Sequence, residues 1–247
     1  MDWSKPPRVI AHRGSPREAP ENTLASFRRG LAHTPAIELD VHLTQDGALV
    51  VAHDGFLGRT LPGRGRLGDL TLAQVRSLDA GAWFGPTFTG ERVPTLEEAL
   101  DLAGPAGLVD VEAKTLDGPY PGLVEAVGKL ALARGMRDRV MLTSFDPDAA
   151  HEFKVRFPEM RSGLIAMFDV GAKDVEAVAH YADALVLRHD LVTAEVLAAA
   201  RRQGLLVMAW TVNDAVRARE LWGLGVDAVV TDVPGEMAGA AREAGFP

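Results

Sequence analysis

Short runs of hydrophobic residues alternate along this chain with longer segments in which hydrophobic residues recur every three or four positions. The short runs have the length of strands that are buried on both faces, and the longer segments have the periodicity of amphipathic helices. The pattern predicts eight strands, at residues 8–11, 36–43, 108–113, 140–144, 163–167, 184–187, 205–211 and 227–231. A predicted helix follows each strand, at residues 23–32, 96–103, 122–134, 147–157, 174–181, 194–203, 214–224 and 235–244.

Residues that favour helix ends flank several of these predicted helices. Asp146, Thr193 and Asn213 stand where N-caps are expected, and Pro234 stands in an expected first turn. Gly204 follows one predicted helix, as glycines at helix C-termini often do. Eight strand–helix units in 247 residues are typical of a TIM (β/α)8 barrel. A doubly wound open sheet is the alternative fold, but no G-x-G-x-x-G motif follows the first strand. We therefore predict that residues 1–247 form a single TIM-barrel domain.

One interval departs from this rhythm. An Asp46-Gly47 turn follows the strand at 36–43, and an apolar run at 48–52 returns the chain as a hairpin. Residues 54–94 are then too many for a strand–helix loop, and we interpret them as an insertion with a short helix at 72–78. The insertion begins with an arginine cluster, Arg59, Arg64 and Arg66. We expect this cluster in a solvated loop, with steering of an anionic substrate as the alternative.

Composition narrows the class of protein. A hydrophobic fraction of 47 % is enough for a large core, and a net charge of -8 argues against a nucleic-acid-binding surface. The absence of cysteine excludes disulfides, thiolate metal sites and cysteine nucleophiles. No segment has the roughly 18 consecutive apolar residues of a membrane span, and the N-terminus lacks the apolar run of a signal peptide. We therefore expect a cytoplasmic protein with no integral membrane segment.

Acidic residues gather at the ends of two predicted strands. In a TIM barrel the catalytic residues lie at the C-terminal ends of strands. Side chains alternate along a strand, so Glu38 and Asp40 share one face, and Glu112 shares a face of the strand at 108–113 with Lys114. Three carboxylates on neighbouring strands favour a hard cation such as Mg²⁺ or Ca²⁺. A salt-bridge network with Arg13 and Lys114 is the alternative, but it leaves three acids facing two bases.

Two histidines stand close to this acidic group in the predicted fold. His12 ends the first strand, and the hairpin brings His53 back beside the second. Phosphoryl chemistry requires cationic groups for the non-bridging oxygens, which Arg13 and Lys114 can provide, and two titratable groups for proton transfer. The alternative is a pair of hydrogen-bonded histidines with no chemical role. For His42, on the same strand face as Asp40, a substrate contact and no chemical role are equally plausible.

The order of motifs resembles that of a known family. HRG at 12–14, PENT at 20–23, ELDVHLTQDGALVVAHD at 38–54 and VPTLEEAL at 93–100 are followed by VEAK, TSF, AWTVN and GVDAVVTDVP, which ends at residue 234. This ordered set is similar to that of the glycerophosphodiester phosphodiesterase family and covers nearly the whole chain. The resemblance implies a TIM barrel in which the insertion at 54–94 forms a small subdomain at the mouth of the active site.

The resemblance also implies roles for individual residues. The implied metal ligands are Glu38, Asp40 and Glu112, and the implied acid/base pair is His12 and His53. Arg13 and Lys114 are implied to bind the phosphate, with Glu21 and Asn22 supporting the site. Trp210 is implied to form an aromatic wall for glycerol. Trp210 could instead be a core aromatic residue. Asp110 stands where asparagine is frequent in the family, and we expect it to pair with Lys114 or Arg13.

The expected function is metal-dependent hydrolysis of a small-molecule glycerophosphodiester to glycerol 3-phosphate and an alcohol. The resemblance does not decide which histidine is the base, or whether water or a glycerol hydroxyl attacks first, the latter through a cyclic phosphate. Two other functions remain open. One is a phospholipase C/D-like phosphodiesterase that acts on lysophospholipids, and the other is a non-catalytic phosphodiester-binding protein on the same scaffold.

Overall fold

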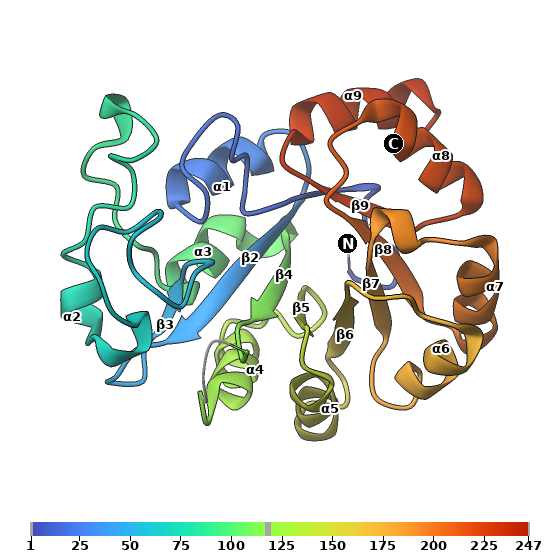
Figure 1. The fold of residues 1–247 in the computed structure, drawn as a ribbon, viewed down its shortest axis with the longest axis horizontal. Coiled ribbons are helices and arrows are strands. Elements are labelled where there is room, and N and C mark those ends of the chain that lie inside the picture. The colour runs from blue at the N-terminus through green and yellow to red at the C-terminus, as the bar shows by residue number, and fades with distance from the viewer. Residues whose placement is uncertain (1, 117–119, 247) are drawn as a thin grey trace.

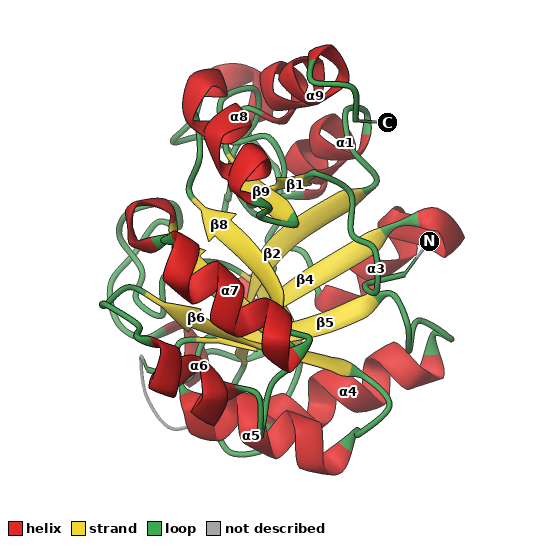
Figure 2. Cartoon of the chain, turned by 90° about the vertical axis from the view of Figure 1, so that its right-hand side faces the viewer, coloured by secondary structure: helices red, strands yellow, loops and turns green. Residues whose placement is uncertain are grey.

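A computed structural model describes residues 2–116 and 120–246 and shows a closed barrel of eight parallel strands (Figures 1 and 2). The barrel strands are β1 (Val9–Ala11), β2 (Ala36–Leu43), β4 (Leu108–Ala113), β5 (Val140–Ser144), β6 (Arg161–Ala166), β7 (Ala184–Arg188), β8 (Leu206–Trp210) and β9 (Ala228–Thr231). Pairing of β1 with both β2 and β9 closes the ring. The predicted TIM barrel is therefore confirmed. The hairpin return forms β3 (Leu49–Val51), which pairs antiparallel with β2 outside the ring.

Helices surround the strands, as Figure 2 shows. They are α1 (Leu24–Leu31), α3 (Leu96–Ala103), α4 (Leu123–Ala133), α5 (Pro147–Arg156), α6 (Ala172–Val178), α7 (Ala194–Gln203), α8 (Ala215–Leu224) and α9 (Pro234–Glu243), with the short α2 (Leu72–Val75) in the insertion. Single 3₁₀ turns lie at Leu67–Asp69, Pro86–Phe88, Gly104–Ala106 and His189–Leu191. The predicted helix at 72–78 ends early, and that at 174–181 begins and ends earlier than expected.

The helix ends follow the predicted signals with one exception. The side chains of Asp146 and Thr193 cap α5 and α7, and Gly204 ends α7 in a left-handed conformation. The prediction that Asn213 caps α8 is wrong, because Asp214 accepts the capping hydrogen bond, from the Arg217 amide at 2.8 Å. The side chain of Asn213 is hydrogen-bonded instead to Thr231, the last residue of β9, and to Asp232, the residue after it.

The barrel interior is apolar at the end where the strands begin. Ile10, Leu108, Met141 and Met208 form a buried cluster there with Trp3. The Trp3 indole donates to the Arg139 carbonyl oxygen at 2.9 Å, which fixes the N-terminal segment over this end of the barrel. Larger hydrophobic clusters fill the layer between the strands and the helices. Polar residues in the interior are therefore left to the opposite end, where the strands finish.

The segment 54–94 lies at the left of Figure 1, beside β3 and α3. A small hydrophobic cluster of its own joins Leu61, Leu67 and Val75 to Val50 on β3. This packing explains how a segment with little regular structure holds a defined position next to the hairpin. Its classification as a subdomain stays a prediction.

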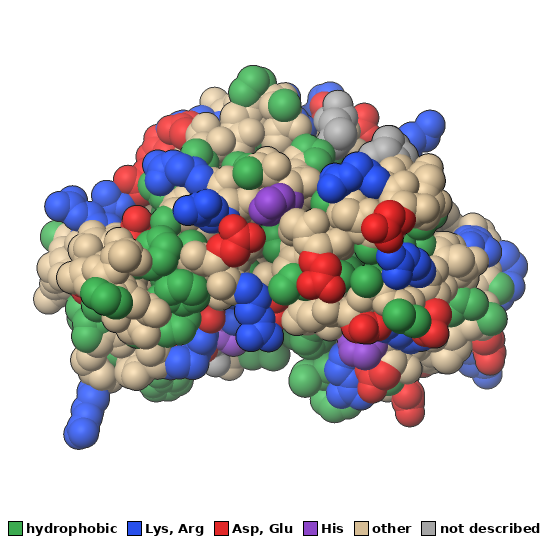
Figure 3. All heavy atoms as spheres, turned by 90° about the horizontal axis from the view of Figure 1, so that it is seen from above, with side chains coloured by type: hydrophobic (Ala, Val, Ile, Leu, Met, Phe, Trp, Pro, Cys, Tyr) green, Lys and Arg blue, Asp and Glu red, His purple; other side chains and the backbone are tan. Residues whose placement is uncertain are grey.

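Acidic and basic side chains are interspersed on the face of the molecule shown in Figure 3. Within residues 2–116 and 120–246, no helix combines the length and the apolar character that crossing a bilayer requires. The cytoplasmic location expected from the sequence stays a prediction.

Gly14 allows the loop after β1 to lie against α1. Its φ is +88°, and a Cβ atom there would lie 2.4 Å from Ser26 Oγ and 2.5 Å from the Ser26 carbonyl carbon. Gly47 has a similar φ of +80° with nothing within 4 Å of such an atom, so it is the matched control.

We expect Gly47→Ala to lower the free energy of unfolding by about 1 kcal/mol through backbone strain. Gly14→Ala adds a steric clash with backbone atoms and should cost at least about 2 kcal/mol more. Urea unfolding of both variants measures this difference. Equal losses would show that α1 moves away freely and that the loop is not held by this contact.

Candidate active site

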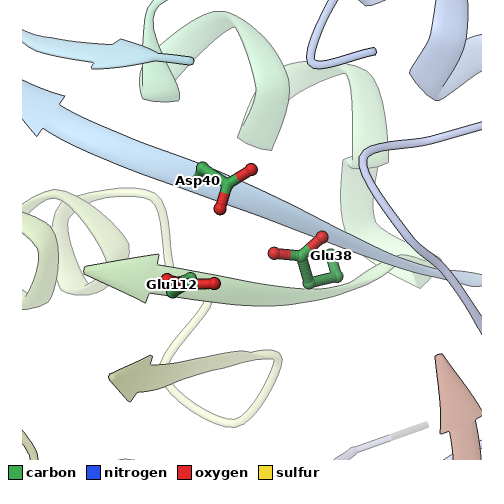
Figure 4. A group of neighbouring side chains, drawn as sticks. All are labelled: Glu38, Asp40 and Glu112. Atoms are coloured by element: carbon green, nitrogen blue, oxygen red, sulfur yellow. The ribbon is translucent and has the colours of Figure 1, made fainter. Parts of the chain in front are cut away.

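Three carboxylates converge at the C-terminal end of the barrel. Glu38 and Asp40 extend from β2, and Glu112 extends from β4 (Figure 4). The register pairs Asp40 with Glu112 and Glu38 with Asp110 across the two strands. One oxygen from each member of the triad lies within 4.8 Å of the other two, and all three residues are buried. The strand alternation therefore produces the oxygen-rich cluster that it predicted.

Two cationic side chains contact this triad. Lys114 Nζ lies 2.8 Å from Asp40 Oδ1 and 2.5 Å from Glu112 Oε1, and Arg13 Nε lies 3.3 Å from Asp40 Oδ2. Asn22 donates to Asp40 Oδ2 at 2.7 Å. Burial alone would raise the pKa of Asp40, but Lys114 and Arg13 hold it well below its usual value. Asp40 is therefore ionised and well paired.

The other two carboxyls of the triad are less well compensated. Burial, with the charge of Asp40, raises the pKa of Glu112 to about 7 and that of Glu38 well above its usual value. Glu38 Oε2 accepts the Arg13 backbone N–H at 3.0 Å. Two cations thus leave an excess of buried negative charge, which a bound cation would neutralise. The donor set, three carboxylates, suits a hard divalent ion, so the triad can hold a metal ion.

The two predicted histidines line the same cavity, and an aspartate orients each of them. His12 Nδ1 lies 2.6 Å from Asp232 Oδ1, and His53 Nδ1 lies 2.7 Å from Asp54 Oδ1. The Nδ1 atoms are thereby occupied, which leaves Nε2 of each ring for proton exchange in the cavity. Burial lowers the pKa of His53 despite the negative charge of Asp40.

Sequence reasoning assigned no role to these two aspartates. Asn213 also belongs to this arrangement, since its Nδ2 donates to Asp232 Oδ2 at 2.8 Å and its Oδ1 accepts the Asp232 amide at 2.8 Å. Asp54 and Asp232 follow His53 and Thr231 directly, at the ends of the predicted strand segments. That position was the available signal, because strand-end carboxylates are suited to hold the second nitrogen of a nearby imidazole.

The residues expected to support the site lie against it. Glu21 Oε1 accepts from Arg13 Nη1 at 2.9 Å. Asn22 donates to Asp40 and also accepts the Asp40 amide at 3.3 Å. Both Arg13 and Asn22 have positive φ, 51° and 57°, so this loop is held in a conformation that these contacts must stabilise.

The whole cavity has a volume of about 250 Å³, and an apolar wall faces its charged half. The apolar half is lined by Phe145, Ile165, Met167, Val186, Trp210 and Val230. Trp210 packs edge-to-face on Phe145, with ring centroids 5.5 Å apart, and its indole donates to the Val186 carbonyl oxygen at 3.2 Å. Trp210 therefore presents a fixed aromatic surface to the cavity.

The sequence also singled out His42 and Asp110, and of these two only Asp110 lines the cavity. His42 is fully buried, with Nε2 3.3 Å from the His53 carbonyl oxygen, and it is not among the residues that line the cavity. The expectation that Asp110 pairs with Lys114 or Arg13 is wrong. Asp110 accepts instead from Thr143 Oγ1 at 2.7 Å, and burial raises its pKa to about 7.

The fold and the cavity together define a TIM-barrel enzyme with an acidic, cation-attracting centre. The model of the glycerophosphoryl diester phosphodiesterase family matches residues 12–236. The chain therefore belongs to this family, as its motifs predicted, and it is a phosphoric diester hydrolase.

Full-length relatives agree with this assignment. A glycerophosphodiester phosphodiesterase of Caldanaerobacter subterraneus is 35 % identical over 241 residues, which cover 96 % of this chain and 98 % of the relative. A glycerophosphodiester phosphodiesterase of Bacillus subtilis is 31 % identical and covers 92 % of this chain and 83 % of its own length. The structure of an Oleispira antarctica phosphodiesterase in complex with the product sn-glycerol-3-phosphate has a TM-score of 0.87 at 31 % identity, covering 96 % of this chain and 97 % of that one.

The buried carboxyl of Asp110 predicts a pH-dependent stability difference. In the folded protein the pKa of Asp110 is about 7, above the usual value of 3.8. The Asp110 carboxyl therefore favours the folded state most at low pH, where it is protonated in both the folded and the unfolded protein. That stabilisation is lost as pH rises toward 7, because the unfolded state ionises first.

Asp110→Asn keeps the shape and removes this titration. We expect the free energy of unfolding of the variant, minus that of the wild type, to rise by up to about 4 kcal/mol between pH 4 and pH 7 and then to level off. Both proteins are measured in the presence of a chelator. Urea unfolding across this range measures the gain. A difference independent of pH would contradict a buried carboxyl with a raised pKa.

Proposed function

We propose that the chain hydrolyses glycerophosphodiesters to glycerol 3-phosphate and an alcohol, using Mg²⁺ or Ca²⁺ at Glu38, Asp40 and Glu112. The observation that carries this proposal is one cavity that joins a buried carboxylate triad to two aspartate-anchored histidines. The bound sn-glycerol-3-phosphate of the Oleispira relative supports this substrate class. A divalent ion on the triad would act as a Lewis acid toward phosphate and glycerol oxygens.

The remaining roles fall to side chains of this chain. Arg13 and Lys114 neutralise the non-bridging phosphate oxygens, whose charge grows in the transition state. One of His12 and His53 removes the proton of the nucleophile, and the other donates a proton to the leaving alkoxide. Trp210 packs against the carbon atoms of glycerol.

The supporting elements complete the proposal. Glu21 and Asn22 hold Arg13 and Asp40 in place. The insertion at 54–94 serves as a subdomain beside the mouth of the cavity. His53 directly precedes the insertion, and Asp54, the first residue of the insertion, contacts its Nδ1, so the insertion and the acid/base chemistry are linked.

The apolar wall favours a second candidate, a phosphodiesterase that acts on lysophospholipids. Met167 lines the cavity and is an exposed hydrophobic residue. Leu116 is also exposed and lines an adjoining cavity that shares His53 and Lys114 with the first. Such a surface could contact an acyl chain. Comparing turnover of glycerophosphocholine with turnover of a lysophospholipid separates the two candidates, since only the second predicts a preference for the acylated substrate.

Metal removal tests the role of the triad. EDTA should abolish hydrolysis of glycerophosphocholine, and excess Mg²⁺ or Ca²⁺ should restore it. Glu112→Gln should weaken the cation affinity, measured by the cation concentration that gives half-maximal activity. Glu195→Gln, an exposed site on α7, is the matched control and should leave the affinity unchanged. Full turnover in chelator would refute metal dependence.

Alanine substitutions test the two histidines. Because each is assigned a proton transfer, His12→Ala and His53→Ala should each lower kcat by about 10²- to 10⁴-fold. His180→Ala removes an exposed imidazole and serves as the control. Circular dichroism should show an unchanged fold in all three. Near-normal kcat in either site variant would remove that histidine from the mechanism. A wild-type protein that binds glycerophosphocholine without hydrolysing it would indicate a binding protein.

A further inference from the structure

Arg59, in the insertion, joins two carboxylates that belong to different parts of the site. Its Nε donates to Asp54 Oδ2 at 2.5 Å. Its Nη1 and Nη2 donate to Glu21 Oε2 and Oε1 at 2.8 and 2.7 Å. The guanidinium is planar, so contacts along two of its edges fix the two carboxylates relative to each other. The side chain of Arg59 is 47 % exposed, as expected for a solvated loop, but its guanidinium is bound by both carboxylates.

Each of these carboxylates holds a residue of the proposed mechanism through its other contacts. Asp54 uses Oδ1 for His53 Nδ1 at 2.7 Å and Oδ2 for Arg59. Glu21 Oε1 accepts from Arg13 Nη1 at 2.9 Å as well as from Arg59. Arg13 Nε in turn lies 3.3 Å from Asp40 Oδ2. A continuous chain of charged contacts therefore runs from His53 through Arg59 to Arg13.

We propose that Arg59 is a positioning residue that sets His53 and Arg13 relative to each other by bridging Asp54 and Glu21. This inference rests on the proposed roles of those two residues in hydrolysis. It also gives the insertion a function, since Arg59 belongs to the insertion and Glu21 to the loop before α1. The two histidines then differ, because His12 Nδ1 contacts Asp232, and Asp232 is held in turn by Asn213, neither of which belongs to the insertion.

A purely structural role for Arg59 is the competing explanation. Exposed ion pairs usually contribute little to stability, and this one could simply tie the loop to the barrel. The two explanations differ in where the loss appears. A positioning role changes kcat through His53 and KM through Arg13, whereas a loop tether changes stability and the active fraction of the protein.

The first measurement compares Arg59→Ala with Arg64→Ala, an exposed arginine of the same loop. With glycerophosphocholine and saturating Mg²⁺, Arg59→Ala should lower kcat/KM by about 10- to 100-fold, with both a lower kcat and a higher KM. Arg64→Ala should match the wild type. If Arg59→Ala fails to fold, Arg59→Lys replaces it, because lysine keeps the charge but cannot bridge both carboxylates.

Double-mutant cycles then locate the effect. In an Asp54→Asn background the Arg59 substitution should no longer lower kcat, and in a Glu21→Gln background it should no longer raise KM. In an Asp232→Asn background, which alters the other histidine, both effects should persist in full. Equal losses in all three backgrounds, or an unchanged kcat and KM, would overturn the proposal.

The failure of the proposed function would look different. It would appear as a wild-type protein without turnover, or as a His53→Ala variant with normal turnover, before any cycle is measured. Either result would overturn the positioning role together with the function on which it rests. An active wild type with an additive cycle would overturn the role of Arg59 alone.

Discussion

The C-terminal end of the barrel holds three buried carboxylates within 4.8 Å of one another. Glu38, Asp40 and Glu112 occupy a space into which Lys114 and Arg13 bring only two positive charges. Isolated carboxylates are costly to bury, and the raised pKa of Glu112, about 7, expresses that cost. An apolar cluster in the barrel interior, which includes Ile10, Leu108 and Met141, packs beside the carboxylates. A divalent cation would turn this electrostatic cost into binding energy.

Acidic groups also organise the residues around the triad. Arg13 and the two imidazoles are each held by a further acidic group. Glu21 contacts Arg13, Asp54 contacts His53 and Asp232 contacts His12. This arrangement fixes the orientation of each ring or guanidinium before the substrate binds, which reduces the reorganisation needed during the reaction.

Much of the barrel could be predicted because strand alternation and helix periodicity are local properties. The predicted barrel made the strands at 36–43 and 108–113 neighbours, and alternation placed Glu38, Asp40 and Glu112 on their polar faces. The structure pairs these two strands and brings the three residues together. Long-range contacts decided what could not be predicted. Asn213 and Asp214 are both good capping residues, and the choice between them depends on Thr231 and Asp232, distant in sequence, which engage the side chain of Asn213. Arg59 lies in a segment without periodicity, so no local pattern indicated its contacts.

Isothermal titration calorimetry of the chelator-treated protein measures whether the triad binds the proposed divalent cation. One Mg²⁺ or Ca²⁺ should bind per chain. Binding at pH 6.5 should release protons, seen as a dependence of the heat on the buffer, because the pKa of Glu112 is about 7 before the cation arrives. No binding at millimolar concentrations of either cation would show that the triad is not a metal site.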